Sequence, residues 1–318
     1  MSDAAQSESF VFTCRGTAGF FSFAAEGPMI YDCFTFFNEL ELLELRLHEL
    51  ADVADKFVLV EATKTHSNKS KPLYYRENHS RFGEFHDKII HIIVDDLPDA
   101  KDPWVLENYQ RNCIARGLVN CRPDDFVLVS DLDEIPRATT VAKVSRGIRF
   151  RDDFFSSRAH AALNSRWVHK IFHRRGFRRT LRYNHPFVLK FRQSQYKHFM
   201  NCRVVQPPFG HGTRMLYFRD FSCAEEIRHS GFKIVENGGW HFSWMGDVQR
   251  VQEKLAAYAH QEWNLPQFAD AQHIRQAINE GRSFFGGDKR HEFVPLDASF
   301  PRYLLEHPEK FSSWIKPV

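Results

Sequence analysis

The sequence predicts an α/β fold in which helices cover a mostly parallel central sheet. Apolar runs with the length of strands alternate with amphipathic stretches from residue 29 to residue 129. This alternation is typical of parallel sheets, because two parallel strands need a crossover, usually a helix, between them. A chain of 318 residues is also long enough to bury a full core. We therefore expect a single domain over residues 29–318.

The first elements are a strand, a helix and two further strands. Ile30–Phe36 is an apolar run with the length of a strand, and we expect further strands at 56–60 and 88–94. The intervening residues 63–80 are polar and loop-like. Asn38 is a suitable N-cap for a helix in which leucines recur at helical spacing, at positions 40, 43, 47 and 50.

The next elements continue the alternation. A proline near its start and Gly117 near its end predict a helix over 103–118. The apolar run 125–129 is a fourth strand. After residue 217 we expect two helices, one from Asp247 to about residue 260 and one over 271–279.

Three carboxylates follow the fourth strand. Asp131 and Asp133 are spaced i, i+2, which places both on one face of a strand, and Glu134 lies beside them. Two hard oxygen ligands at the carboxyl end of a buried strand suit a divalent cation that also holds a phosphate. We predict that Asp131 and Asp133 bind Mn²⁺ or Mg²⁺. The alternative is a solvated strand end.

The segment Gly238–Trp244, GGWHFSW, combines two glycines with aromatic residues and a histidine. Close backbone approach is possible at the glycines, and His241 is a candidate to complete the metal shell or to contact a diphosphate. Trp240 is a candidate to stack on a sugar. A packed aromatic strand with a hydrogen-bonded core histidine is the alternative.

Four polar residues are candidates for binding a donor nucleotide. Asn108 and Arg111 lie one turn apart on the third helix, and the planar fork of Arg111 suits a phosphate. Glu61 and Thr63 follow the end of the second strand, where polar groups suit a nucleotide base or ribose. Ordinary polar surface explains each of these positions equally well.

Positive charge is concentrated in one region. The chain has 43 Lys and Arg against 40 Asp and Glu, yet residues 154–219 contain 14 Lys or Arg and no acid. We predict a basic, aromatic inserted lobe over 145–217 that faces an anionic partner. The alternative is a non-catalytic protein that grips an anionic polymer or nucleic acid through this lobe. No helix-turn-helix, zinc-finger or RNP signature accompanies it, so we expect no nucleic-acid partner.

Residues 1–28 are predicted to form a weakly ordered N-terminal extension. No apolar run approaches the roughly 20 residues that a membrane helix needs, so we expect no transmembrane segment. The six cysteines are scattered without a C-x-x-C pair, which indicates free thiols in a reducing compartment. We expect a cytoplasmic protein, or one peripheral at a membrane.

Five stretches give the chain a resemblance to glycosyltransferase family 17, with a weaker match over 301–314. They are MIYDCFTFFNELELLELRLHEL, DKFVLVEATKTHS, ENYQRN, DDFVLVSDLDEIPR and GGWHFSW. The resemblance implies a GT-A type nucleotide-sugar-binding fold, a UDP-sugar donor carrying N-acetylglucosamine, Mn²⁺ dependence and an inverting outcome in β linkage. It also implies that Asp131 and Asp133 are the metal-binding pair.

An inverting transfer needs a carboxylate that deprotonates the acceptor hydroxyl. Asp247, at a predicted helix start, is our candidate base, with Glu225 and Glu226 as alternatives. The cation would neutralise charge on the UDP leaving group. Because the predicted lobe is basic, we expect a saccharide acceptor that is phosphorylated or lipid-linked.

Overall fold

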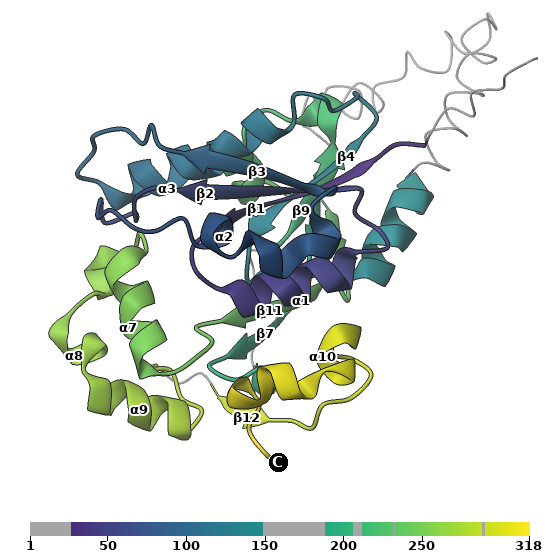
Figure 1. The fold of residues 1–318 in the computed structure, drawn as a ribbon. Coiled ribbons are helices and arrows are strands. Elements are labelled where there is room, and N and C mark those ends of the chain that lie inside the picture. Colours follow the sequence, from purple (N-terminus) through teal and green to yellow (C-terminus); the bar gives the residue numbers. More distant parts are fainter. Residues whose placement is uncertain (1–26, 149–187, 206–211, 232, 288–289) are drawn as a thin grey trace, which may run out of the picture.

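The computed structural model describes residues 27–148, 188–205, 212–231, 233–287 and 290–318 (Figure 1). Strands and helices alternate through the N-terminal half, and the prediction of a mixed α/β fold is confirmed. The predicted N-terminal extension lies almost wholly outside the described residues. The same is true of the arginine-dense centre of the predicted basic lobe, residues 174–179.

The larger of two sheets has seven strands: β1 (Ile30–Phe36), β2 (Lys56–Ala62), β3 (Ile89–Val94), β4 (Phe126–Asp131), β6 (Leu189–Phe191), β9 (Arg214–Tyr217) and β10 (Lys233–Val235). Their order is β10-β6-β9-β4-β1-β2-β3. Strand β1 pairs in parallel with β2 and β4, β2 with β3, and β6 with β10, whereas β9 runs antiparallel to both of its neighbours. The sheet is therefore mostly parallel, as predicted.

The smaller sheet has five strands: β5 (Glu134–Pro136), β7 (Ser194–Lys197), β8 (Cys202–Val204), β11 (Gly239–Ser243) and β12 (His291–Phe293). Their order is β12-β8-β7-β11-β5. Strand β4 of the larger sheet ends at Asp131 and β5 begins at Glu134, so the chain crosses between the sheets within four residues. We call Asp131–Glu134 the carboxylate turn. Residues 188–217, which the sequence places in the basic lobe, supply β6 to β9.

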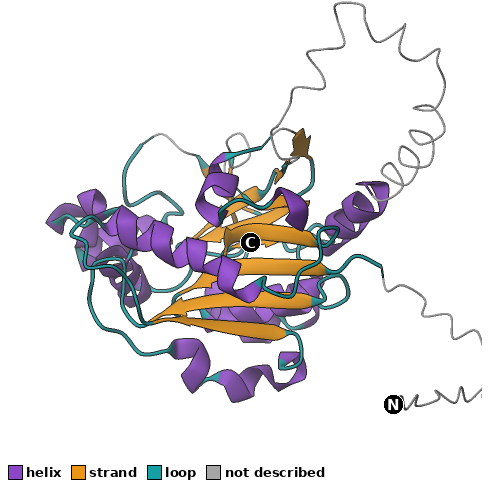
Figure 2. Cartoon of the chain, turned by 90° about the horizontal axis from the view of Figure 1, so that it is seen from above, coloured by secondary structure: helices purple, strands orange, loops and turns teal. Residues whose placement is uncertain are grey.

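The helices are α1 (Leu40–Leu50), α2 (Tyr74–Glu77), α3 (Pro103–Asn112), α6 (Ala224–His229), α7 (Val248–Ala257), α8 (Pro266–Ala269), α9 (Ala271–Asn279) and α10 (Arg302–Glu306), with a further helix over 138–148. They lie on both sides of the strands (Figure 2). Helices α1, α2 and α10 share one core cluster with alternate residues of β1, and the segment after α3 and helix α6 share the other. Helices α7 and α9 pack on each other around a third, smaller cluster.

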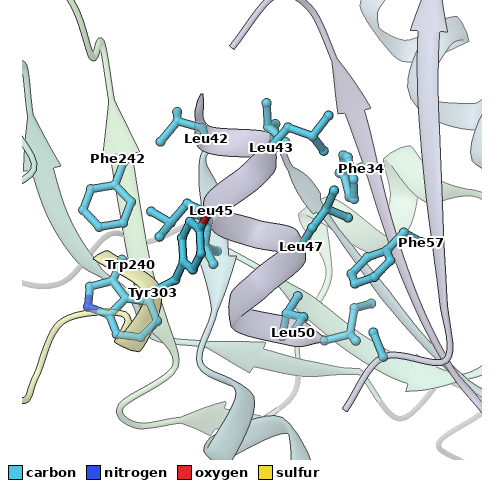
Figure 3. Packing of buried hydrophobic residues seen from close by; sticks show 14 of the residues in the cluster. Phe34, Leu42, Leu43, Leu45, Leu47, Leu50, Phe57, Trp240, Phe242 and Tyr303 are labelled. Atoms are coloured by element: carbon cyan, nitrogen blue, oxygen red, sulfur yellow. The ribbon is translucent and has the colours of Figure 1, made fainter. Parts of the chain in front are cut away.

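Helix α1 lies between the two sheets (Figure 3). Leu43 and Leu47 face Phe34 and Phe57 of the larger sheet, and its opposite side faces Trp240, Phe242 and Tyr303. Leucines lie on two sides of this helix, so both sides must be covered by apolar partners. Each buried leucine contributes about 1.5–3 kcal/mol relative to an exposed one. This packing holds the two ends of the carboxylate turn in one core.

Several predicted boundaries need correction. Asn38 is not the N-cap of α1: Glu39 holds that position, and no side chain caps the helix. Helix α3 ends at Asn112 and continues as a 3₁₀ turn to Gly117, where a Cβ atom would lie 2.4 Å from Val58. The predicted fourth strand begins one residue later and runs two residues further, to Asp131.

Two other expectations concern cysteines and the membrane. Within the described ranges, Cys33, Cys113, Cys121, Cys202 and Cys223 are free thiols. No helix in the part of the chain that the structure describes is long and apolar enough to cross a membrane.

Candidate functional site

A cavity of about 460 Å³ opens at the carboxyl ends of the parallel strands. Its lining includes residues 35–37 at the end of β1, Thr65 and His66 after β2, and the carboxylate turn at the end of β4. Strands β2 and β4 flank β1 on opposite sides, so the chain order reverses there. Ligands of open α/β sheets bind at such a switch point, which makes this cavity the candidate site.

Asp131 is the first acid of the carboxylate turn and is paired with two arginines. Its Oδ2 accepts a hydrogen bond of 2.6 Å from Arg228 of α6, and its Oδ1 accepts one of 3.3 Å from Arg111 of α3. Burial alone would raise the pKa of Asp131, but the two guanidinium groups lower it below its usual value. The carboxylate is therefore ionised at neutral pH.

Asp133 is held by a different pair of residues. Its Oδ2 lies 3.1 Å from Nζ of Lys254 on α7, and its Oδ1 lies 3.5 Å from Nε2 of His241 on β11. Burial opposes ionisation, yet Lys254 and His241 together hold the pKa of Asp133 well below its usual range. Both acids of the predicted pair thus carry charge in the cavity.

Glu134, the last residue of the carboxylate turn, bonds both to Arg228 and to the backbone of Asp131. Its carboxylate accepts two hydrogen bonds from Arg228, of 2.7 and 2.9 Å, and one of 3.2 Å from the backbone N–H of Asp131. Glu134 is only 1% exposed, so it contributes little direct contact with a ligand. Its pairing fixes Arg228 over the turn.

Arg46 holds the carboxylate turn from the core. This fully buried residue of α1 donates through Nη1 to the carbonyl oxygens of Asp131, Leu132 and Glu134, at 2.9, 3.1 and 3.1 Å. Its other nitrogens form a bidentate pair with buried Asp32, at 2.7 Å for both bonds. One side chain therefore bonds to three carbonyls of the turn, and the Glu134 carbonyl also accepts a hydrogen bond of 3.1 Å from the Thr213 hydroxyl.

Two ionised carboxylates face the cavity, each paired with cationic side chains. Within the described ranges, no three or more His, Cys, Asp or Glu side chains are gathered to hold a metal ion. Asp131, Asp133 and His241 therefore do not form a three-residue site, and His241 lies beside Asp133 instead. Two ionised carboxylates with room for water and phosphate are the kind of site that Mg²⁺ uses.

A family model matches the part of the chain that contains the carboxylate turn. The model of glycosyltransferase family 17 matches residues 14–154, a segment that contains the whole carboxylate turn. The chain resembles glycosyltransferase family 17. The chain is also similar to curated proteins from Homo sapiens, Rattus norvegicus and Mus musculus. Each of these is a beta-1,4-mannosyl-glycoprotein 4-beta-N-acetylglucosaminyltransferase.

The similarity to these relatives is distant. The human protein is 26% identical and the rat and mouse proteins are 25% identical, in each case over 86% of this chain. The matched region covers 52% of each relative, so the chain spans about half the length of the curated relatives it matches.

The structure brings five of the residues predicted from the sequence into one cavity. They are Arg111, Asp131, Asp133, Glu225 and His241. Arg111 connects them, because its guanidinium pairs with Glu225 and Glu107 as well as with Asp131. The family 17 match over residues 14–154 covers the parts of this charged cluster on α3 and the carboxylate turn, whereas β11 and α6 lie outside it.

Four predicted donor-binding residues lie elsewhere. Glu61 is fully buried and accepts hydrogen bonds from the backbone of Tyr75 and from His91. Thr63 donates to the carbonyl of residue 94 at the end of β3. Neither residue lines the cavity, which Thr65 and His66 line instead at this point of the chain.

The other two are on elements that do border the cavity. Asn108 is on α3 but is absent from the cavity lining. Trp240 is buried in the core, where its indole N–H donates to the carbonyl of Ser299 and Arg137 stacks on its ring. Trp240 packs against α1 and is 1% exposed, so no face of its ring is open for a sugar to stack on. The sugar-stacking role predicted for Trp240 is therefore wrong.

Two of the three candidate bases also lie outside the cavity. Asp247 is exposed and caps α7 by accepting a 3.0 Å hydrogen bond from the N–H of Arg250. Glu226 accepts a hydrogen bond of 2.9 Å from Ser222. Glu225, one residue earlier on α6, lines the cavity. Helical geometry turns neighbouring side chains by about 100°, which explains why only one of the adjacent glutamates faces inward.

Sequence reasoning missed the residues that hold the acids in place. Arg46 is one of several charged residues among the leucines of α1, so the sequence did not single it out. Arg228 and Lys254 carried no signal either, since basic residues near the end of a helix are ordinary. Their function depends on how α6 and α7 pack against β4, which no local pattern reveals.

Proposed function

We propose that this chain is a glycosyltransferase that moves N-acetylglucosamine, or a related sugar, from a UDP-sugar to a saccharide acceptor in β linkage. The observation that carries the proposal is the carboxylate turn, which lies at the switch point of the sheet and inside the family 17 match. The names of the relatives support a mannose-containing acceptor and a β-1,4 linkage.

The cavity supplies charges of both signs for a nucleotide diphosphate. Asp131 and Asp133 would hold Mn²⁺ or Mg²⁺, which when bound neutralises negative charge on the diphosphate leaving group. Arg111, Arg228 and Lys254 already lie against these carboxylates and are within reach of the same phosphates. Fixed charges of this kind stabilise a leaving group without reorganisation during the reaction.

Glu225 is the base that we propose for an inverting transfer. Of the three carboxylates considered as bases, it is the one that lines the cavity. Arg111 and His229 pair with it and, against the effect of burial, lower its pKa, so the group is ionised and able to accept a proton. Both partners also fix the direction of its carboxylate.

The acceptor is proposed to enter from the α6 side of the cavity. His229 and Arg228 border that side, and a phosphorylated or lipid-linked saccharide would suit their charge. We propose that the protein acts in the cytoplasm or at a membrane surface, where a UDP-sugar donor and such an acceptor could meet.

The direct test is UDP release from UDP-N-acetylglucosamine by the variants Asp131→Asn and Asp133→Asn, with Mn²⁺ and a saccharide array. Each should lose at least about 100-fold in turnover, the usual effect of removing a preorganised electrostatic contact. Asp124→Asn is the matched control, since Asp124 is exposed and pairs only at the surface with Arg219. Full activity in either cavity variant would refute the assignment.

A further inference from the structure

One end of the cavity is lined by aromatic rings. Trp104 of α3 contacts His260 edge to face, with ring centroids 4.5 Å apart, and Trp244 contacts Tyr258 in the same way at 5.2 Å. The rings of Tyr258 and His260 are 5.7 Å apart and join the two pairs. All four residues line the cavity, and we call them the aromatic wall.

The aromatic wall has features of a surface prepared for a ligand. The indole of Trp104 is 39% exposed although it lies in a cavity. The hydroxyl of Tyr258 is buried without a hydrogen-bond partner. Trp244 has a φ of 59°, a left-handed conformation that is costly for a bulky residue. An exposed indole and an unpaired buried hydroxyl both gain free energy when a planar polar ring covers them.

The wall lies on the β2 side of the cavity. The end of α7 is fixed to the loop after β2, since the N–H of His66 donates to the carbonyl of Ala257 at 3.0 Å and Ser67 donates to Ala256 at 2.7 Å. Trp104 is in the first turn of α3, which follows β3. Glu225 pairs with Arg111 in the last turn of α3, so Trp104 and Glu225 lie at opposite ends of this helix.

Lys254 connects the wall to the carboxylates. Its Nζ is 3.1 Å from Asp133 and 5.6 Å from the ring centroid of Trp244. A diphosphate bound at the carboxylate turn therefore has aromatic rings on one side and Glu225 on the other. The sugar must lie towards Glu225, where the proposed base is, which leaves the wall for the nucleoside.

We propose that the aromatic wall binds the uracil base of the donor by stacking, with the Tyr258 hydroxyl hydrogen-bonded to the base edge. This inference rests on the proposed function and specifies which end of the cavity takes which part of the donor. Stacking of a nucleobase on an aromatic side chain is worth about 1–3 kcal/mol. Planar rings on both partners, together with a buried hydroxyl, favour the base over a saccharide ring.

Calorimetric titration of the full chain with UDP and, separately, with inorganic pyrophosphate tests the assignment when Mn²⁺ is kept constant. Trp104→Ala should weaken UDP binding between about fivefold and about 150-fold, and pyrophosphate binding should stay within about twofold. Trp104→Phe should restore most of the UDP affinity. Trp263→Ala is the matched control, because Trp263 is equally exposed at 40% but lies outside the cavity lining, and it should change neither ligand.

Three results would overturn the inference. UDP binding by Trp104→Ala at wild-type strength, with a raised KM for the saccharide acceptor, would make the wall an acceptor subsite. Equal losses for UDP and pyrophosphate would show that Trp104 acts only through the fold. Wild-type protein that binds pyrophosphate but not UDP would refute the proposed function itself, and the inference with it.

Discussion

The two sides of the carboxylate turn are held by positive charge in different ways. On the core side, the guanidinium of Arg46 bonds to backbone carbonyls and to Asp32, and all of these groups are buried. On the cavity side, Arg228 and Lys254 bond to the carboxylates themselves. The core contacts fix the backbone of the turn, whereas the cavity contacts involve the groups that a ligand would use.

The geometry of the carboxylate turn and the charge balance of its acids therefore depend on different residues. A buried ion pair is weak support for stability, because desolvation offsets most of the attraction. The Arg46–Asp32 pair is better understood as a positioning device, since it replaces solvent for three carbonyl groups of one turn. We propose that the cavity cations exchange partners when a metal ion or phosphate binds, while the turn keeps its shape.

The largest expected effect is on the core side. Arg46→Met leaves the Asp32 carboxylate buried without its partner and removes a hydrogen bond from three carbonyls, and should lower the free energy of unfolding by about 3–5 kcal/mol. Urea unfolding followed by circular dichroism measures this change. Arg116→Met is the control, because Arg116 forms a comparable bidentate pair with Asp96 at the surface, where such pairs contribute little. Equal stability losses in the two variants would contradict a special role for Arg46.

A smaller effect, of opposite sign for two ligands, is expected on the cavity side. Lys254→Met removes a cation that competes with Mn²⁺ for Asp133, so Mn²⁺ should bind about tenfold more tightly when no nucleotide is present. The same variant should bind UDP more weakly, because a phosphate contact is lost. Electron paramagnetic resonance measures free Mn²⁺ directly.

Lys56→Met provides the matched control for that experiment, since Lys56 bonds only to the carbonyl of Asp87 at the surface. Weaker binding of both ligands by Lys254→Met would indicate a structural role for Lys254 and would contradict the exchange of partners.

Some features of the fold and of the site could be predicted from the sequence because they depend on local patterns, and others could not because they depend on packing between distant segments. Strand β1 and helix α9 have the predicted bounds, because apolar runs and helical periodicity are local signals. The spacing of Asp131 and Asp133 identified the acids for the same reason. Arg228, Lys254 and the aromatic wall come from segments far apart in the chain, and only the packing of α3, α6 and α7 brings them together. Asp247 and Trp240 had suitable chemistry but are used for capping and for the core.

The smallest expected effect concerns a charge cluster around Glu44, which lies two residues before Arg46 on α1. Burial opposes ionisation of Glu44, but hydrogen bonds from Lys310, Tyr303 and Arg81 lower its pKa from 4.5 to about 2. The folded state therefore gains stability from this carboxylate above pH 4.5 and loses it as the pH falls towards 2. The stability difference between the wild type and Glu44→Gln, measured by urea unfolding, should shrink from pH 6 to pH 3. A constant difference over that range would contradict the assignment.

The most direct measurement is calorimetric titration of UDP into the wild type and Asp133→Asn, each with Mn²⁺ and with a chelator. If the carboxylate turn is a metal-dependent nucleotide site, Mn²⁺ should strengthen UDP binding by the wild type at least about tenfold, a gain of about 1.4 kcal/mol. The same addition should leave Asp133→Asn nearly unchanged. Equal UDP affinity of the wild type with and without Mn²⁺ would contradict the assignment of the turn.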